Sequence, residues 1–464
     1  NVLIQAGGAY RQTGSDVIAP GGDIDIAARR IEITEATEAR STRAEQRFRQ
    51  SGLSVSVSNP VVSAAQGVAQ MGQAAGEVRD PRLKALAAGS AALTVKDTAS
   101  TVARDPKSAT SVGINLSVGS SKSRQTSEQS ASEAHGSTVR AGGNVSLRAE
   151  GSGPDSNLTI RGSQVLAGAS TRLQADGDIS LQAAANTAEQ HSTQSSQSGS
   201  IGVGLNFGGS QNGLSFQASA SRARGQADGT DITWTHTQVQ GADVQIESGA
   251  NTTLQGAVIQ GERIRATVGG DLTVHSVQDT STYDSKHHSA SGGVSICVPP
   301  LCYGASSANA ILSKAKVQGE FASVSEQSGL RAGDQGFHVE VKGHTELQGG
   351  LIASTQAAVD EGRNRLATGT LRTGDLQNKD VYKASSTGVS AGTSGASAGH
   401  ASVDGQQSST TRSGISGGEV VITDEAGQME RTGQTAEQTL AAVNREVLSS
   451  TEANGLSQRW DGQK

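Results

Sequence analysis

The chain has 464 residues, with 44 acidic and 38 basic side chains and a formal net charge of −6. This balance gives no overall basic field for a polyanion, so nucleic acid is excluded as an expected partner. Aromatic residues make up 2% of the chain and 59 residues are glycine, so the apolar side chains are mainly small or branched aliphatics. Such a composition argues against the ring-rich core of a globular enzyme of this length.

No apolar run reaches the roughly 20 residues that a membrane-spanning helix needs. The chain starts at Asn1 without a signal-peptide pattern. We therefore expect a piece of a longer protein, whose export signal would lie outside this sequence.

Segments of the chain repeat at a spacing of 93 residues. Residues 177–201 align without a gap to residues 270–294, and residues 252–259 align with residues 345–352 at the same offset. A degenerate earlier copy begins at Gly21 with the letters GGDIDIAA. Fixed periods are typical of repeat architectures, in which each unit buries its apolar side against the next unit.

Within each copy, apolar and polar residues alternate over short stretches that follow a glycine-containing corner. Ile179 and Leu181 show this alternation, and Leu272 and Val274 are their counterparts one repeat later. Alternation with period two is typical of β-strands, and glycine suits the tight corners. The pattern predicts an all-β fold, namely a right-handed parallel β-helix (a β-solenoid) with a narrow aliphatic interior. With coils about 4.8 Å apart, we expect a rod of roughly 60–80 Å.

A projecting antiparallel hairpin is predicted beside the coils. A Ser-rich stretch at 187–200, with counterparts at 120–137 and 280–293, breaks the coil pattern and leads into two alternating segments, 201–207 and 214–220. Two alternating segments joined by a short Gly- and Asn-containing loop are typical of hairpins. The apolar positions expected on one face of this hairpin are Ile201, Val203, Leu205, Phe207, Leu214 and Phe216.

Other segments depart from the coil pattern in different ways. Apolar residues at helical spacing predict two helices, about 60–77 and 81–103, as a short helical insertion, and residues 434–448 show the same period. Residues 385–403 are of low complexity and alternate weakly. The expected division is a β-helix module at 1–59, a helical hairpin insertion at 60–110, β-helix modules at 111–200, 201–293 and 294–433, and a helical linker at 434–464.

The two cysteines are the first candidates for chemistry. Cys297 and Cys302 enclose a Val-Pro-Pro-Leu tetrapeptide. In a secreted chain this spacing favours a disulfide that clamps a tight loop, while free thiols and a metal-ligand pair are the alternatives.

Histidines and corner carboxylates are the next candidates. His287 and His288, with His275 upstream, could serve a metal or pH-sensing role, but a solvated polar loop is the favoured interpretation. Residues at the glycine corners could bind calcium, but capping of the turn is favoured because the calcium-binding nonapeptide is not repeated. These corner residues are Asp23, Asn144, Asp178 and Asp271.

No motif of an enzyme emerges from the sequence. Acidic residues are scattered, few aromatic rings are available to stack on sugars, and no Ser-His-Asp arrangement, nucleophile elbow or phosphate-binding loop is found. A polysaccharide-cleaving β-helix is therefore the least favoured interpretation. We expect no catalytic residue, no cofactor and no metal site.

Several segments resemble a known family of exported proteins. Residues 324–355 resemble the filamentous-haemagglutinin repeat of two-partner secretion exoproteins. Residues 413–428 and the tail that follows are similar to the segment before the pre-toxin region of CdiA-type contact-dependent growth inhibition effectors. The resemblance covers essentially the whole chain.

The resemblance implies a secreted, rod-like protein on the bacterial cell surface, exported by an outer-membrane two-partner secretion transporter. It also implies contact with a target cell's outer membrane or surface receptor, and help in delivering a C-terminal toxin. The family's secretion domain and toxin domain have no counterpart in this sequence, so an immunity protein is implied only through the missing toxin. The alternative is a haemagglutinin-type adhesin that binds host or neighbouring cells.

Alternating apolar strands are compatible with a membrane once their backbone groups are paired. We therefore hypothesise that the hairpin face with Ile201, Val203 and Leu205 inserts into, or assembles at, the target outer membrane. A packing role within the protein is the alternative.

Overall fold

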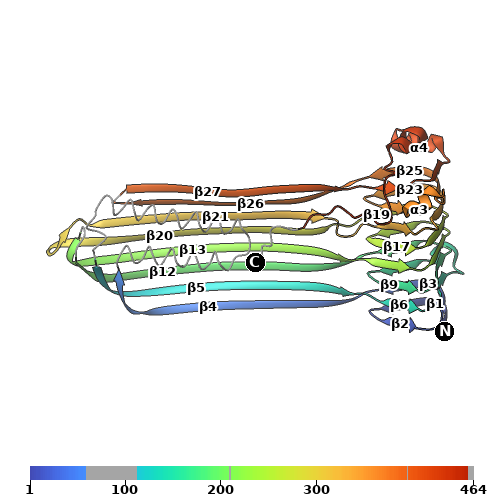
Figure 1. Ribbon diagram of the computed structural model, residues 1–464. Coiled ribbons are helices and arrows are strands. Elements are labelled where there is room, and N and C mark those ends of the chain that lie inside the picture. Colours follow the sequence, from blue (N-terminus) through green and yellow to red (C-terminus); the bar gives the residue numbers. More distant parts are fainter. Residues whose placement is uncertain (59–111, 208–210, 394, 458–464) are drawn as a thin grey trace.

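The computed structural model of the protein describes residues 1–58, 112–207, 211–393 and 395–457 (Figure 1). The described parts are built mainly of β-strands, and their few helices are short. The all-β prediction is therefore confirmed. The helices expected at 60–77 and 81–103 lie outside the described residues.

A stack of parallel coils forms one end of the molecule (Figure 1). Two sides of each coil belong to one sheet of parallel strands. Its described strands are β1 (Val2–Thr13), β3 (Ile24–Thr34), β7 (Val145–Ala149), β8 (Leu158–Arg161), β10 (Ser170–Ala175), β11 (Ile179–Gln182), β15 (Asp243–Ser248), β16 (Thr252–Gln255), β18 (Arg263–Val268), β19 (Leu272–His275), β23 (Phe337–Gln348), β25 (Arg365–Gly374) and β29 (Glu419–Ile422).

The third side of the coils is a separate sheet of short parallel strands. These strands are β2 (Asp16–Ala19), β6 (Thr138–Ala141), β9 (Gln164–Ala167), β14 (Thr237–Gln240), β17 (Ala257–Gly261), β22 (Gly329–Ala332), β24 (Leu351–Ala353) and β28 (Gly414–Ile415). Short helices interrupt or end the stack at η2 (Gly153–Asp155), α3 (Gln356–Asp360), α4 (Glu425–Thr432) and α5 (Ala436–Ala442).

Equivalent side chains of successive coils stack to form the core. Leu181 pairs with Ile160 of the coil on one side and with Leu254 of the coil on the other. Leu254 pairs in turn with Val274, which pairs with Leu347. All five side chains are fully buried. The interior is thus a set of aliphatic columns, which explains why the chain needs so few rings.

The long repeat seen in the sequence corresponds to two coils. Val244 pairs with Ile264 of the next coil, and Ile264 pairs with Phe337 of the coil after that. One coil therefore covers only 244–263, whereas the next covers 264–336 because it contains an excursion. The repeat in the sequence reflects a pair of layers rather than a single one.

The excursions form a third sheet, which is antiparallel and projects from one corner of the coils (Figure 1). Neighbouring strands in the figure are also neighbours in the hydrogen-bonded order. From one edge to the other, the strands of this sheet are β4 (Ala36–Ser58), β5 (Val112–His135), β12 (Ala184–Phe207), β13 (Gln211–Thr235), β20 (Asp279–Gly304), β21 (Ser307–Ser323), β26 (Leu376–Gly392) and β27 (Gly395–Thr411).

The hairpin predicted at 201–220 is present but is only the far end of a much longer one. Val203 pairs with Phe216, and the ladder continues down to Ala184 and Thr235. The Ser-rich stretches, which interrupt the coil pattern of the sequence, are themselves strands. The boundaries expected at 200 and 293 fall within β12 and β20, and the remaining divisions stay predictions.

The proportions of the molecule differ from the expected rod. The described coils stack nine deep between β1 and β29, which gives a stack of about 40 Å at roughly 4.8 Å per layer. The expectation of roughly 60–80 Å is therefore wrong. Much of the chain lies in the antiparallel strands instead, and β12 with its 24 residues is about 80 Å long at roughly 3.4 Å per residue.

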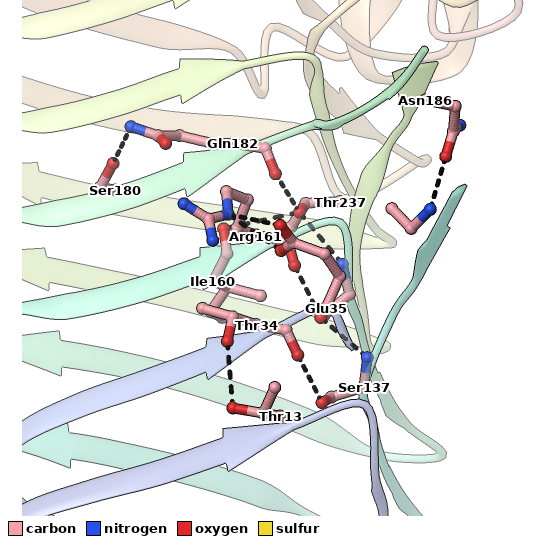
Figure 2. Close-up of polar contacts among 12 residues, drawn as sticks. Thr13, Thr34, Glu35, Ser137, Ile160, Arg161, Ser180, Gln182, Asn186 and Thr237 are labelled. Carbon is pink, nitrogen blue, oxygen red and sulfur yellow. Dashed lines mark hydrogen bonds and ion pairs between the residues drawn. The ribbon is translucent and has the colours of Figure 1, made fainter. Parts of the chain in front are cut away.

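Polar side chains hold the corner where the strands leave the coil (Figure 2). The Ser137 hydroxyl donates to the Thr34 carbonyl at 2.7 Å, and the Thr237 hydroxyl donates to the Gln182 carbonyl at 2.5 Å. Arg161 forms an ion pair with Glu35 at 2.9 Å. Each hydroxyl thus links the chain just before a hairpin to the chain just after it, at a carbonyl that also accepts from a backbone N–H, that of Gly14 or Gly162.

Asparagines join the bases of neighbouring hairpins. The Asn186 side chain accepts from the Ala134 N–H at 2.7 Å and donates to the Thr235 hydroxyl at 3.0 Å. Asn378 repeats this arrangement, accepting from the Val324 N–H at 3.0 Å. The sequence reasoning missed these residues, although the polar Asn interrupts alternation at the start of each strand.

The C-terminal part packs on the coil rather than forming a long helix. The helix predicted over 434–448 ends at Ala442, because Val443 has extended backbone and the Asn444 carbonyl accepts from the Ile415 N–H at 3.0 Å. Val447 is buried against Leu351. The physical reason for the error is that the helical spacing of the valines reflects burial against the coil, not continuation of the helix.

The first prediction concerns the core columns. Leu181→Ala removes a fully buried side chain between two coils, and we expect the free energy of unfolding to fall by about 2–5 kcal/mol. Ser180→Ala changes the neighbouring outward-facing residue and should leave the urea midpoint almost unchanged. Equal midpoints for the two variants would contradict the columnar core.

The second prediction concerns the two-layer repeat. Deleting residues 171–263 removes one full repeat and joins positions that occupy equivalent places in the register. We expect this variant to fold with its remaining hairpins paired. Deleting residues 244–263 removes only one coil, which carries no hairpin. The hairpins of the two flanking coils then lie one layer apart, and the antiparallel sheet has no room for the strands of both. Proteolysis within the hairpins should be fast in the second variant and slow in the first.

Candidate interaction face of the antiparallel sheet

The six apolar residues predicted on the hairpin lie on one face of the antiparallel sheet. They are Ile201, Val203, Leu205 and Phe207 of β12 and Leu214 and Phe216 of β13. Residues two apart on a strand point to the same side, and directly paired residues share that side. The pairing of Val203 with Phe216 and of Leu205 with Leu214 therefore unites both strands. We call this side the Ile201 face and the other side the Ser200 face.

The register extends the apolar character to neighbouring strands. Ile201 pairs with Val118 of β5, and Val118 pairs with Leu53 of β4. In the other direction Ala218, the partner of Ile201 in β13, pairs with Val294 of β20. The resulting apolar patch, at the end of the sheet far from the coil, comprises Leu53, Val55, Ile114, Leu116, Val118, Ile201, Val203, Leu205, Phe207, Leu214, Phe216, Val294 and Ile296.

Many of these side chains are open to solvent. Leu53 and Ile201 retain 66% and 69% of their accessible surface, and Val118 and Phe207 each retain 55%. Single exposed apolar residues are ordinary on a protein surface, but a contiguous group of this extent is typical of interaction surfaces and makes this face the candidate site. The sequence reasoning identified only the members on β12 and β13, because register between distant strands cannot be read from alternation alone.

The Ser200 face has a different chemistry. Along the outer part of the described strands, beyond Gln129 and Gln190, it carries mainly Ser, Gln, Asn, Gly and Ala, with a few apolar residues such as Phe48 and Ile311, and no Lys, Arg, Asp or Glu. Serine hydroxyls pair across neighbouring strands, as in Ser198 with Ser221 at 2.7 Å. The end of the sheet far from the coil is therefore amphipathic, with an apolar side and a mainly polar side without Lys, Arg, Asp or Glu.

A disulfide closes the far end of β20. Cys297 and Cys302 are bonded, with their Cα atoms 5.1 Å apart. The Cys297 N–H donates to the Ser306 hydroxyl at 3.1 Å, and both cysteines are buried. The bond restrains the intervening loop next to the apolar patch.

Charged side chains begin where the apolar patch ends. Arg47 and Arg124 both contact Glu45, and the hydrogen bond from Arg47 is the main reason that the pKa of Glu45 lies below its usual value. Nearer the coil, the hydrogen bond from His191 lowers the pKa of Asp228. These carboxylates are therefore ionised over the physiological pH range.

The histidines do not gather into one site. His287 and His288 are consecutive in β20, so their side chains lie on opposite faces, and His275 lies in β19 of the coil. The expectation of a loop around His287 is wrong, since these residues belong to a paired strand. Within the described ranges, no group of three His, Cys, Asp or Glu side chains is placed to hold a metal ion.

The corner residues cap the backbone of the adjacent coil. The Asp23 side chain accepts from the Asn144 N–H at 2.7 Å, and Asp178 accepts from the Asn251 N–H at 2.8 Å. Asp271 does the same for the His344 N–H at 2.7 Å. The capping interpretation of these corners is confirmed, and the carboxylates form a ladder that follows the stack.

The residues assembled here provide contact surface rather than reactive groups. The apolar patch offers methyl groups and aromatic rings to a partner, and the Ser200 face offers hydroxyl and amide groups. Among the described residues, no helix is both long enough and apolar enough to span a membrane.

A protein-family model described as the hemagglutinin repeat matches residues 118–293. This segment contains most of β5, all of β12 and β13, and the coils between them. No solved structure matches the chain to a significant degree.

The chain is also similar to long proteins named CdiA. The toxin CdiA of Escherichia coli is 36% identical over 460 residues, which cover 93% of this chain and 14% of that protein. The tRNA nuclease CdiA of Yersinia mollaretii is 35% identical, with 93% and 15% covered. The deoxyribonuclease CdiA of Yersinia pseudotuberculosis serotype O:3 is 37% identical, with 85% and 36% covered. The chain thus spans between 14% and 36% of the length of these relatives.

The third prediction concerns the cysteines. Protein purified and denatured without reductant should show no reactive thiol, because Cys297 and Cys302 are bonded to each other. After reduction, two thiols per chain should react with a thiol reagent, since the chain contains two cysteines. A Cys302→Ser variant should expose one thiol before reduction. Two free thiols in the untreated protein would contradict the disulfide.

Proposed function

Because the chain is a haemagglutinin-repeat region of the filamentous-haemagglutinin and CdiA type, we propose that it helps to carry a C-terminal toxin across the outer membrane of a target bacterium. The parent protein is then a secreted exoprotein of the cell surface, exported by an outer-membrane two-partner secretion transporter. The region itself is non-enzymatic and acts through its surfaces.

The observation that carries this proposal is the exposed apolar patch on the Ile201 face. Along β12 the patch extends over six residue steps, from Ile201 to Phe207, or about 20 Å at roughly 3.4 Å per residue. This length is comparable to the hydrocarbon core of a bilayer, which is about 30 Å thick. The backbone N–H and C=O groups inside the sheet are already paired by the ladders. These strands can therefore contact lipid without exposing unpaired hydrogen-bonding groups to it.

The coil provides the base from which the hairpins project. We take its hand to be right-handed, because connections between parallel strands of one sheet are almost always right-handed. The columns of buried aliphatic side chains make it a stiff support. A stiff base keeps the hairpins aligned and presents the apolar patch roughly 60–80 Å from the coil, since Ile201 and Phe207 lie far along β12 from its start at Ala184 at about 3.4 Å per residue.

The fourth prediction tests the apolar patch. Val203→Asp with Leu205→Asp places two carboxylates on the Ile201 face, and each charge in a bilayer interior costs about 2.5–3.5 kcal/mol. We expect binding of the chain to outer-membrane vesicles of a Gram-negative bacterium to fall by at least about tenfold. Co-sedimentation with the vesicles provides the measurement.

The matched control changes the opposite face. Ser196→Asp with Ser198→Asp adds the same two charges on the Ser200 face of the same strand and should leave vesicle binding unchanged. If both double variants bind as well as the parent chain, the patch has only a packing role. If instead the Ser200 face determines attachment to intact cells, the adhesin alternative replaces delivery.

A further inference from the structure

Charged residues on the Ile201 face are sorted into rows across the sheet. One row of Ser, Gly and Ala separates the apolar patch from three rows in which Lys and Arg dominate, and Glu45 is the single acidic residue of these three described rows. We call the basic residues of these rows without an ion pair among the described residues the basic belt. They are Arg49, Lys122, Arg222, Arg224, Lys314 and Lys316.

The register shows that the belt crosses the sheet. Arg49 of β4 pairs with Lys122 of β5, and Lys122 is linked through Gln197 to Arg222 of β13. The next row runs from Arg224 through His288 to Lys314 of β21. Five of the six belt residues are exposed and Lys316 is partly exposed. The charge of Lys316 contributes to lowering the pKa of Asp284, whereas the five exposed belt residues face the surroundings.

Acidic residues dominate the rows nearer the coil. Glu128, Asp228 and Asp284 lie in one row, and Glu189 and Glu320 lie in the next. From the far end towards the coil, the Ile201 face is thus apolar, then basic, then acidic. The Ser200 face shows no such order, because its outer part is uncharged.

The Ile201 face of a second copy of the chain is not complementary in charge to this order of apolar, basic and acidic rows. Two Ile201 faces stacked with their strands in the same direction would place one basic belt on the other, which is repulsive. If the strands of the two copies ran in opposite directions and the apolar patches overlapped, each basic belt would lie beyond the far end of the other sheet. No acidic row would then face it. Self-association would therefore leave the belt without a partner of opposite charge.

We propose that the basic belt binds the phosphate groups of an anionic lipid surface while the apolar patch contacts the acyl chains. The proposal rests on the membrane contact proposed above and names the lipid chemistry that the same face selects. Apolar side chains beside a basic polar region are typical of protein segments that lie at a membrane interface.

The distances along a strand fit this arrangement. Lys122 lies four residues from Val118, or about 14 Å at roughly 3.4 Å per residue. Lys and Arg side chains extend several ångströms and keep their charged ends in the polar headgroup layer while their stems cover apolar surface. The belt is then at headgroup level when the patch is in contact with the acyl chains.

The fifth prediction tests the belt with vesicles of defined composition. We expect the chain to bind phosphatidylcholine vesicles with about 30% phosphatidylglycerol at least about tenfold more tightly than pure phosphatidylcholine vesicles at about 0.1 M NaCl, with the difference reduced at high salt. The triple variant Lys122→Gln, Arg222→Gln, Lys314→Gln should lose this preference but still bind neutral vesicles. The control variant Arg30→Gln, Arg140→Gln, Lys342→Gln removes three exposed charges from the coil and should retain it.

Different results separate this inference from the proposed function. If the belt variant keeps its preference for anionic vesicles while Val203→Asp with Leu205→Asp abolishes all vesicle binding, the belt has no lipid role but the membrane contact stands. If the parent chain binds neither kind of vesicle, both proposals are wrong. Belt-dependent binding to heparin without binding to vesicles would assign the belt to an acidic polysaccharide and overturn the lipid proposal.

Discussion

The strand spacing of about 4.8 Å, shared by parallel and antiparallel sheets, is the constraint on which the molecule depends. Each hairpin adds two strands to the antiparallel sheet and therefore needs the height of two coils. The described hairpins leave the stack after β3, β11, β19 and β25, which lie in alternate layers. One plain coil and one coil with an excursion thus form the smallest unit in which both sheets stay in register, and this unit is the repeat seen in the sequence.

Because of the same spacing, the alternating segments of separate hairpins combine into one continuous surface. A single hairpin with Ile201, Val203 and Leu205 on one side would expose only a narrow strip. Because every hairpin leaves at the same corner, neighbouring hairpins pair along most of their length, and equivalent rows align across the sheet (Figure 1). The polar contacts of Ser137, Thr237 and Asn186 at the base hold that alignment. A wide sheet normally twists, whereas here its strands are anchored to stacked coils.

The sequence predicts the coil better than the hairpins for a physical reason. In the coil one side of every strand is buried, so pairs such as Ile179 and Leu181 alternate clearly with polar residues. In the Ser-rich part of β12, both faces are polar, so alternation disappears although the strand continues. Ser, Gln and Gly also have low strand propensity, and the long ladder between β12 and β13 supplies the stability that propensity lacks. The length of the hairpins, and hence the short coil stack, was therefore not predictable from composition or periodicity.

The distribution of charge on the candidate face was likewise not predictable from the sequence. A net charge of −6 indicates a weakly acidic protein and argues against polyanions as partners of the whole chain. Net charge, however, contains no information on which side chains share a row. Lys122, Arg222 and Lys314 lie far apart in the sequence, and only the pairing of β5, β12, β13, β20 and β21 brings them to one face. Since charges farther apart than about 10 Å are largely screened at 0.1 M salt, a partner at the belt experiences those nearby cations rather than the average of the chain.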